Sequence, residues 1–544
     1  MLHYDLGGYG RKITTGSKEA QFWFDRGLVW LYAYNHEAAI ACFRKALDAD
    51  AECAMAFWGI AAASGPNYNQ PWEGLEPHEC DEVISTARAA IKAAHNVAGG
   101  MSPVEQDLIH AIAKRFPDAP VDDFFPWLNA YAEAMREVHK TYPEDLDVAA
   151  LFAEAMMNRT PWQLWDLSTG SPANGADTDE AREVLERALE RRCAWDHPGI
   201  LHFYIHLMEM SPTPELALRH GDRLSTLVPD AGHLIHMGTH IDVLCGDYHN
   251  VVTKNSKAIE ADRKWLEREG ADNFYTVYRC HNYHFKVYGA MFLGQPEPAL
   301  AAAEELVETL PAEAKLRQMA DWFEAFVPMK MHVLIRFGMW DDILTANLPE
   351  DRNLYAMTTA MMRYARAVAL ANKGDIPAAE AERVEFNAAH KAVPKSRMLF
   401  NNTCQDILKV AEAMMLGEIE FKKGNKEAAL AHLRRSVELD DTLPYDEPWG
   451  WMQPTRHALG ALLLDAGRYD EAEAIYRADL GLDDTLARAC QHPANVWSLH
   501  GLHECLNKRG EKIEILYVKQ LLDRALARAE VPIRASCYCR NAAT

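Results

Sequence analysis

Residues 20–47 read AQFWFDRGLVWLYAYNHEAAIACFRKAL and contain two apolar segments on either side of Asn35-His36. Large and small apolar residues recur every three or four positions in both segments, at Trp23, Gly27 and Trp30 and then at Ala39, Phe43 and Ala46. Residues at this spacing share one face of a helix, and Asn is a frequent turn residue. The stretch therefore predicts two helices joined by a tight turn at Asn35-His36.

The same pattern of two helices and a turn recurs along the chain at intervals of 36 to 50 residues. The later turns are Gly246-Asp247, Gly294-Gln295, Gly338-Met339, Gly374-Asp375, Gly424-Asn425, Gly467-Arg468 and Arg509-Gly510. Hairpins with small and aromatic residues at these offsets resemble the tetratricopeptide repeat, whose standard period is about 34 residues. The resemblance implies an all-α fold, a superhelical solenoid of tetratricopeptide-like helical hairpins that runs as a single continuous array over residues 1–544 and has a concave groove.

Three aromatic-rich loops interrupt the helical pattern, at residues 64–77, 158–178 and 442–454. Pro, Gly and Asn in these loops end helices. We expect the loops to fold over the solenoid and roof an apolar pocket with Trp72, Trp162, Trp165, Trp449 and Trp451. The alternative is that they are hydrophobic plugs that cover the ends of repeats.

Histidines are concentrated in one part of the chain, with ten of the 23 between His197 and His284. Seven of them stand three or four positions apart, as His202/His206, His233/His236/His240 and His281/His284. Histidines at this spacing share one helical face. Ala217, taken as the small residue of a second repeat helix, predicts a helix start near Pro198, and the turns at Gly246 and Gly294 predict starts near Gly232 and Cys280. The repeat resemblance then places all seven histidines in the groove. We name residues 198–300 the His-rich groove repeats.

Imidazole is the commonest protein ligand for transition metals, so the histidine face predicts a metal site. We expect His202, His206, His236 and His240 to bind zinc, copper or iron, with His233, His281 and His284 as alternates or supporting residues. An open coordination position would make such a site catalytic, and four protein ligands would make it structural. The competing interpretation is a histidine-rich face that binds an acidic ligand or senses pH.

The C-terminal segment 530–544 contains Cys537 and Cys539, and Pro532 should stop the preceding helix. Thiolates are soft ligands, so the pair is expected to join the metal site or to act as a redox-active dithiol at the end of a tail that folds back to the histidines. The other interpretation is an ordinary tail.

Glu154 and Asn158 stand four positions apart just before the second aromatic loop. Residues at this spacing share a helical face, so the two are a candidate catalytic acid–amide pair facing the groove. A pair that faces solvent is the equal alternative.

The charge of the chain limits the classes of partner it can bind. The 544-residue chain has a formal net charge of −23, whereas a nucleic-acid-binding domain normally shows a basic face, so we expect no nucleic-acid partner. No run of 18 apolar residues and no signal peptide is visible, so we expect no membrane span and a cytoplasmic location. A small-molecule substrate and a protein or peptide partner both stay open.

Several motifs resemble those of an uncharacterised, distantly StaR-like microbial group of tetratricopeptide-repeat proteins that carries His-x3-His groove motifs and a Cys-x-Cys tail. They are Cys53-Ala-Met-Ala-Phe-Trp-Gly-Ile, Gly65-Pro-Asn-Tyr-Asn, Pro161-Trp-Gln-Leu-Trp, His202-Phe-Tyr-Ile-His, Gly232-His-Leu-Ile-His-Met-Gly-Thr-His, Asp446-Glu-Pro and Ser536-Cys-Tyr-Cys. This resemblance implies a fold and no settled reaction, and fold does not decide function.

From the histidines we expect a metal-dependent enzyme that acts on a small molecule, with the choice between oxidoreductase, hydrolase and lyase left open. The alternatives are a non-enzymatic peptide-binding scaffold and a metal carrier or sensor.

Overall fold

The computed structural model describes residues 4–540, and these residues are almost entirely helical. The only strands among them form two short antiparallel pairs, β1 (Trp165–Asp166) with β2 (Ser171–Pro172) and β3 (Met398–Leu399) with β4 (Asn402–Thr403). The predicted all-α solenoid of helical hairpins is therefore confirmed. The chain divides into two compact units, residues 1–241 with 260–262 and residues 242–259 with 263–544, and a single continuous array over both stays a prediction.

The first unit consists of helices that pack mostly against their neighbours in sequence. They are α1 (Lys18–Tyr32), α2 (His36–Ala49), α3 (Ala54–Ser64), α4 (Pro77–Val97), α5 (Pro103–Ile112), α6 (Phe125–Thr141), α7 (Leu146–Met157), α8 (Thr178–Leu189), α9 (Pro198–Met208), α10 (Leu218–Leu227) and most of α11 (Gly232–Leu244). Short 3₁₀ helices lie at Trp72–Gly74, Arg192–Asp196 and Pro214–Ala217.

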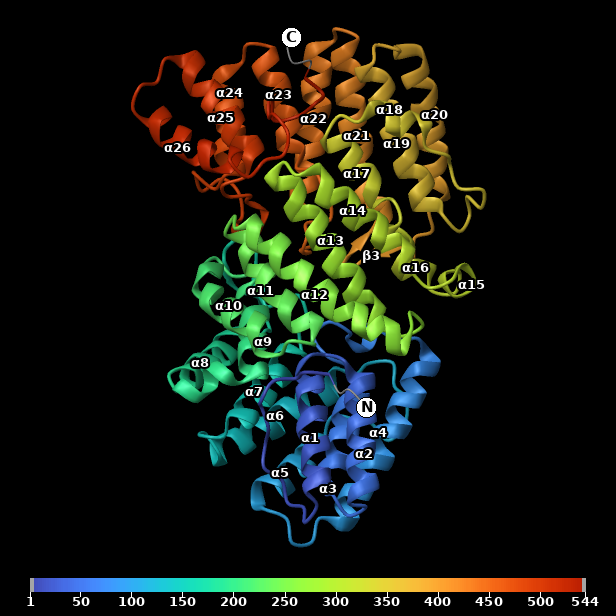
Figure 1. The fold of residues 1–544 in the computed structure, drawn as a ribbon, viewed down its shortest axis with the longest axis vertical. Helices are drawn as coiled ribbons and strands as arrows, with labels where there is room; N and C mark the ends of the chain where they lie inside the picture. The colour runs from blue at the N-terminus through green and yellow to red at the C-terminus, as the bar shows by residue number, and fades with distance from the viewer. Residues whose placement is uncertain (1–3, 541–544) are drawn as a thin grey trace. The chain divides into compact units, whose positions relative to one another are not determined.

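The stretch 20–47 forms the predicted hairpin of α1 and α2, seen in blue in Figure 1. The side chain of Asn35 accepts a hydrogen bond from the amide of Ala38 and so caps α2. The buried ring of Phe43 on α2 lies between Gly27 on α1 and Gly59 on α3, where a β-carbon at either glycine would stand only 2.5 or 2.6 Å from the ring. The small residues of the repeat pattern thus let one aromatic side chain fill the space among three helices.

The second unit repeats this architecture. Its helices are α12 (Tyr248–Glu269), α13 (Thr276–Leu293), α14 (Pro296–Glu308), α15 (Glu313–Leu316), α16 (Ala320–Phe323), α17 (Met329–Arg336), α18 (Trp340–Thr345), α19 (Ala356–Asn372), α20 (Ile376–Ala392), α21 (Cys404–Lys422), α22 (Lys426–Asp441), α23 (Thr455–Asp465), α24 (Tyr469–Asp479), α25 (Val496–Arg509) and α26 (Glu514–Leu526), with 3₁₀ helices at Glu324–Phe326 and Arg488–Cys490. Tyr476 on α24 packs between Gly460 and Gly501 as Phe43 does between its two glycines.

All seven turns predicted from glycine lie between consecutive helices, and their glycines have φ angles between 66° and 88°. This left-handed conformation is strained for residues with a β-carbon, and it ends one helix and redirects the chain into the next. The predicted helix starts at Pro198 and Gly232 are those of α9 and α11, whereas α13 begins at Thr276, four residues before the predicted Cys280. In the described part of the chain, none of the helices combines the length and apolarity needed to cross a membrane.

Candidate metal centre

Two buried helices of the first unit carry the candidate site. Helix α9 begins after His197, whose Nδ1 accepts a hydrogen bond from the amide of Ile200 at 3.2 Å, and every residue of α9 is buried. Helix α11 approaches α10 where Gly221 meets Gly238, since a β-carbon at Gly221 would lie 2.8 Å from the Cα of Gly238. The absence of side chains at this crossing lets the histidines of α11 come close to those of α9.

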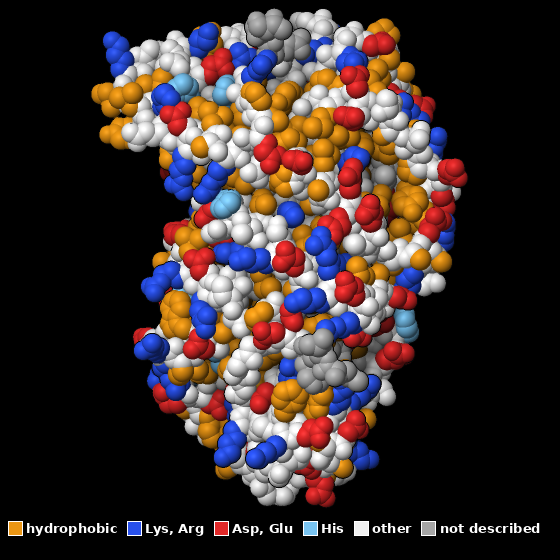
Figure 2. All heavy atoms as spheres, viewed as in Figure 1, with side chains coloured by type: hydrophobic (Ala, Val, Ile, Leu, Met, Phe, Trp, Pro, Cys, Tyr) orange, Lys and Arg blue, Asp and Glu red, His pale blue; other side chains and the backbone are white. Residues whose placement is uncertain are grey.

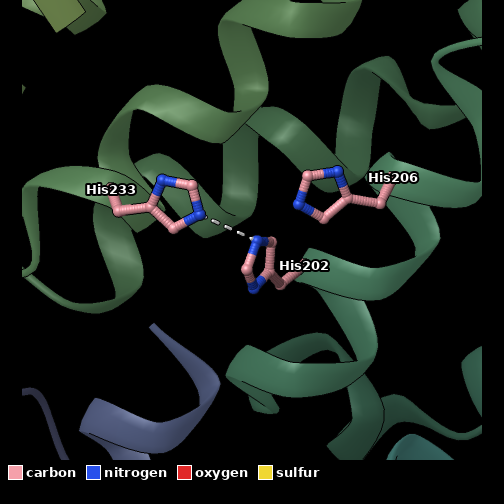
Figure 3. Close-up of side chains that lie close together, drawn as sticks. All are labelled: His202, His206 and His233. Carbon is pink, nitrogen blue, oxygen red and sulfur yellow. Dashed lines mark hydrogen bonds between the residues drawn. The ribbon is translucent and has the colours of Figure 1, made fainter. Parts of the chain in front are cut away.

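His202 and His206 of α9 and His233 of α11 form one group, shown in Figure 3. One ring nitrogen from each lies within 4.8 Å of the other two. The Nε2 atoms of His202 and His233 are 3.2 Å apart, and these three side chains are at most 1% exposed. Three predicted ligands therefore come together away from solvent.

His236 and His240 form a close pair next to this group on α11. Their Nε2 atoms are 2.8 Å apart, and the ring of His240 lies 6.0 Å from that of His206. The first unit thus contains five of the seven predicted imidazoles in one continuous cluster.

A buried carboxylate orients two of these rings. Glu209, which follows α9, accepts hydrogen bonds from Nδ1 of His206 at 2.9 Å and from Nδ1 of His240 at 2.7 Å. The Nδ1 of His202 donates to the backbone oxygen of Tyr32 at 2.7 Å. A carbonyl or carboxylate oxygen only accepts, so the proton of each neutral ring is on Nδ1 and a lone pair is on Nε2. This is the arrangement that supports metal-ligating histidines in proteins.

His206 provides the sharpest sign of a ligand. Its Nε2 is buried and has no hydrogen-bond partner among residues 4–540. A buried acceptor without a donor is unfavourable by about 1–3 kcal/mol, whereas a metal ion would satisfy its lone pair. Two nitrogens that each lie 2.0–2.1 Å from one ion are about 2.9–3.4 Å apart, which fits the spacing of His202 and His233. The donor set therefore fits a transition-metal ion.

Burial lowers the pKa of His202, His206 and His233 well below the ordinary histidine value, and the neighbouring imidazoles lower it further. A charged imidazolium loses hydration when it is buried, so the neutral ring is favoured. Ligating imidazoles must be neutral, and these three are neutral at pH 7.

Three aromatic rings lie close to the ring of His206. Tyr68 lies 4.8 Å, Trp162 5.8 Å and Tyr34 6.1 Å from the imidazole, measured between ring centroids. Tyr34 and Trp162 have φ angles of 53° and 60°. A left-handed backbone at a bulky residue is strained, and such residues concentrate at functional sites.

The sequence predicts that the tryptophans of all three aromatic loops roof one pocket, but in the structure these tryptophans have different contacts. Trp162 contacts His206, and Trp165 donates from Nε1 to the backbone oxygen of Leu207 on α9 at 2.6 Å, so the second loop does cover the site. Trp72 instead stacks on Phe124 with the ring centroids 4.0 Å apart, and it is Tyr68 of the same loop that reaches His206. Trp449 and Trp451 belong to the second unit, where Trp451 contacts His332.

His281 and His284 lie on α13 in the second unit. The ring of Phe400 is 4.7 Å from His281 and 6.2 Å from His284, and the Nε2 of His284 lies 2.8 Å from the sulfur of Met452. Their membership of the same site as the first five histidines stays a prediction.

Cys537 and Cys539 lie in the second unit, and their membership of the histidine site stays a prediction. Cys537 and Cys539 are joined in a disulfide, and their sulfur atoms are grouped with a carboxylate oxygen of Glu418 in the second unit. Sequence reasoning overlooked this because the residues that hold the tail are remote in sequence. The last four residues of the predicted segment 530–544 lie outside the described residues.

Glu154 and Asn158 are both buried at the end of α7, so the alternative that they face solvent is wrong. Burial raises the pKa of Glu154, while the charge of Arg115 and the hydrogen bond of Asn158 lower it. A catalytic role for the pair stays a prediction.

Sequence reasoning missed Glu209, Tyr34 and Tyr68. Glu209 is one of 79 acidic residues, and only its position three residues after His206 connects it with the histidines. Tyr34 and Tyr68 stand beside turn-forming asparagines, which marked the turns but not the direction of the rings.

Two segments of the chain, residues 20–53 and 413–442, match the model of the tetratricopeptide repeat family. The Cut9–Hcn1 hetero-tetramer of APC/C is similar at 14% identity and a TM-score of 0.31, covering 93% of this chain and 76% of that one. Yeast Tom70 is similar at 10% identity and a TM-score of 0.28, covering 93% of this chain and 92% of its own. Human IFIT1, in a dimer with m7Gppp-AAAA, is similar at 11% identity and a TM-score of 0.30, covering 95% and 92%. No curated protein gives a significant match.

Proposed function

We propose that the first unit binds a transition-metal ion through the Nε2 atoms of His202, His206 and His233, and that His236 and His240 supply the remaining nitrogens. The observation that carries the proposal is Glu209, which accepts from Nδ1 of both His206 and His240 and so turns their Nε2 atoms into lone-pair donors. A hydrogen-bonded histidine core without metal would not need a buried Nε2 that lacks a partner among residues 4–540, as His206 has.

The donors favour zinc, copper or iron. Imidazole nitrogen suits these three metals, whereas the hard oxygen-preferring ions Mg²⁺ and Ca²⁺ favour carboxylates and carbonyls. Cys537 and Cys539 are left out of the ligand set because they are paired with each other beside Glu418.

The surroundings support a metal-dependent enzyme that acts on a small molecule. A metal bound here would supply Lewis-acid, water-activating or redox chemistry. The chain itself contributes two things, the carboxylate of Glu209 that orients the ligands and the rings of Tyr34, Tyr68 and Trp162 that exclude bulk water. An apolar wall beside a few oriented polar groups is typical of small-molecule sites.

A peptide-binding scaffold is the second candidate, favoured by the two segments that match the tetratricopeptide repeat. The full burial of α9 argues against a peptide lying along its histidines, since a binding groove needs exposed side chains. A peptide would then bind elsewhere on the repeats. On the face in Figure 2 acidic and basic side chains are interspersed rather than gathered into a basic patch, which disfavours nucleic acid as the partner.

The test is the metal content of the full-length protein, purified without chelators and then reconstituted with Zn²⁺, Cu²⁺ or Fe²⁺ under reducing conditions. We expect about one ion per chain, bound tightly enough to survive gel filtration. Turnover of a small molecule by the loaded protein would separate an enzyme from a metal carrier. A protein that holds no stoichiometric amount of any of the three metals after reconstitution would refute the metal site.

A further inference from the structure

The segment that carries Cys537 and Cys539 is held in the second unit by hydrogen bonds of Ser536. The hydroxyl of Ser536 donates to the backbone oxygen of His457 at 2.8 Å and lies 2.6 Å from the hydroxyl of Tyr476. The backbone oxygen of Ser536 accepts from Arg336 at 2.5 Å. The residue directly before the cysteine pair is therefore anchored on three sides, which gives the two sulfur atoms a defined place.

The two cysteines differ in their exposure. Cys537 is half-buried, whereas Cys539 is 1% exposed, and the amide of Cys539 donates to the sulfur of Cys537 at 3.1 Å. A hydrogen bond to sulfur favours the thiolate form. Cys537 is therefore the thiol that an outside molecule can reach, and Cys539 is the one that can attack it from within.

An arginine without a carboxylate partner stands beside the pair. Arg336 is 6% exposed, makes no ion pair within residues 4–540, and its Nε lacks a hydrogen-bond partner there. One terminal nitrogen contacts Nδ1 of His457 at 3.1 Å, and the guanidinium lies 3.8 Å from the ring centroid of Trp497. Arg336, Cys537 and Cys539 line the same small cavity. A buried cation without an acidic partner is costly unless an anion is present, and a thiolate would provide one.

The remaining cysteines give a useful contrast. The other nine are free, and seven of them are buried. Burial raises the pKa of the Cys42 thiol to about 11 and that of Cys505 to about 12, which makes them poor nucleophiles. Only the tail pair combines a neighbouring thiol, access from outside and a nearby cation.

We propose that Cys537 and Cys539 are a redox-active pair that exchanges electrons with small-molecule or protein disulfides beside Arg336 and Glu418. In the oxidising direction, Cys537 attacks one sulfur of an external disulfide, forming a mixed disulfide and releasing the first external thiol. Cys539 then attacks the sulfur of Cys537, closing the Cys537–Cys539 bond and releasing the second thiol. Two electrons pass from the pair to the external disulfide, and the two cysteine protons end on the released thiols. The reverse sequence uses an external dithiol as the reductant.

Glu418 is placed to assist the proton movement. Its carboxyl group is grouped with both sulfur atoms, and burial raises its pKa to about 7. A carboxyl group with a pKa near neutrality can both accept and return a proton.

The first experiment equilibrates the full-length protein with reduced and oxidised glutathione at graded ratios, quenches it with an alkylating reagent and locates the modified cysteines by mass spectrometry. We expect the peptide with Cys537 and Cys539 to follow a two-electron titration, while buried Cys42 and Cys505 stay reduced. Full alkylation of both tail cysteines at every ratio would overturn the proposal.

Single variants test the order of attack. The C539S variant should accumulate a mixed disulfide between Cys537 and glutathione, and the C537S variant should react at least about tenfold more slowly because Cys539 is buried. Equal reaction rates in the two variants would contradict the assignment.

The role of Arg336 is tested by R336Q and R336K, with the melting temperature measured in parallel. R336Q should slow the alkylation of Cys537 about tenfold, and R336K should restore most of the rate. If R336Q fails to fold, R336K still decides, because a rate of Cys537 alkylation that falls about tenfold in R336K, which keeps the positive charge, would contradict an electrostatic role for Arg336. The metal content of C537S should equal that of the unaltered protein, so this proposal and the metal proposal fail independently.

Discussion

The two groups of histidines are both spaced three or four positions apart on their helices, but they have different surroundings in the structure. In the first unit, His206 and His240 share the carboxylate of Glu209, and His202 donates to a backbone oxygen. In the second unit, His284 meets Met452 and the ring of Phe400. Spacing places imidazoles on one face of a helix, but an acceptor for Nδ1 decides which nitrogen offers its lone pair.

The comparison also shows a shared feature. Among residues 4–540, four residues other than glycine have a positive φ angle, and three of them are aromatic, namely Tyr34, Trp162 and Phe400. Each of the three rings lies against a histidine, two in the first unit and one in the second. The fold therefore uses a strained aromatic residue to cover both groups, and the carboxylate is what sets the first group apart.

The largest expected difference is in metal content. The H206A/H240A double variant should lose the bound metal, with affinity reduced at least about 100-fold, because it removes two ligating or supporting nitrogens. The matched H281A/H284A variant should keep nearly all of it. Elemental analysis of both variants, with circular dichroism to confirm folding, measures the effect. Full metal content in the first variant, or loss only in the second, would reverse the comparison.

The second difference is in how added metal changes the response to acid. Because burial lowers the pKa of His202, His206 and His233, the unfolded chain binds protons first, near pH 6.5, while the folded rings stay neutral. The free energy of unfolding of the metal-free protein should therefore fall as the pH drops below about 6.5, by up to about 1.4 kcal/mol per pH unit for each buried histidine.

The second unit should show the same loss without metal, since burial lowers the pKa of His284 to about 3. Urea unfolding between pH 7.5 and 5.5 measures the loss of unfolding free energy that comes from each of the two groups. H233N and H284N are the matched variants. Added metal should protect the unaltered chain and H284N, but protect H233N less, because the proposed metal site lies in the first group. Equal protection of the two variants by metal would count against a metal site in the first group. Bound metal should also be lost below about pH 6, because ligating imidazoles must be neutral.

The third difference concerns Glu209 alone. The E209Q variant keeps the size of the side chain, but its amide nitrogen donates, so one of the two histidines must place its proton on Nε2 and lose its lone pair. We expect metal affinity to fall about 10- to 100-fold, as is usual for residues that support metal ligands. Calorimetric titration with Zn²⁺ measures it. E154Q, another buried carboxylate in the first unit, is the control, and an equal loss in both variants would show that Glu209 has no special role.

The smallest expected effect concerns the strained backbone. At Trp162, and likewise at Phe400, the glycine variant should be more stable than the alanine variant by about 1 kcal/mol, because glycine tolerates a positive φ and alanine does not. Urea unfolding of the four variants measures the differences. At Trp162 both changes should also weaken metal binding, whereas at Phe400 neither should. Alanine and glycine variants of equal stability would show that these residues are not strained.

Local sequence determined the helices, the turns and the candidate ligands. Glycine at the seven turns, Asn35 at the first hairpin and Pro198 at the start of α9 act within a few residues, so their effects can be read from the chain itself. The spacing of His202 and His206 also depends only on the geometry of one helix.

Tertiary structure decided which of these ligands meet and what supports them. His233 lies 31 residues from His202 and 3.2 Å from it in space, because α10 and α11 cross at two glycines. The backbone oxygen of Tyr32 accepts a hydrogen bond from His202, 170 residues away, and the tail cysteines lie beside Glu418, more than 100 residues earlier in the sequence. Such contacts depend on the angles at which helices pack, and these angles result from many side chains acting together, so no local pattern in the sequence contains them.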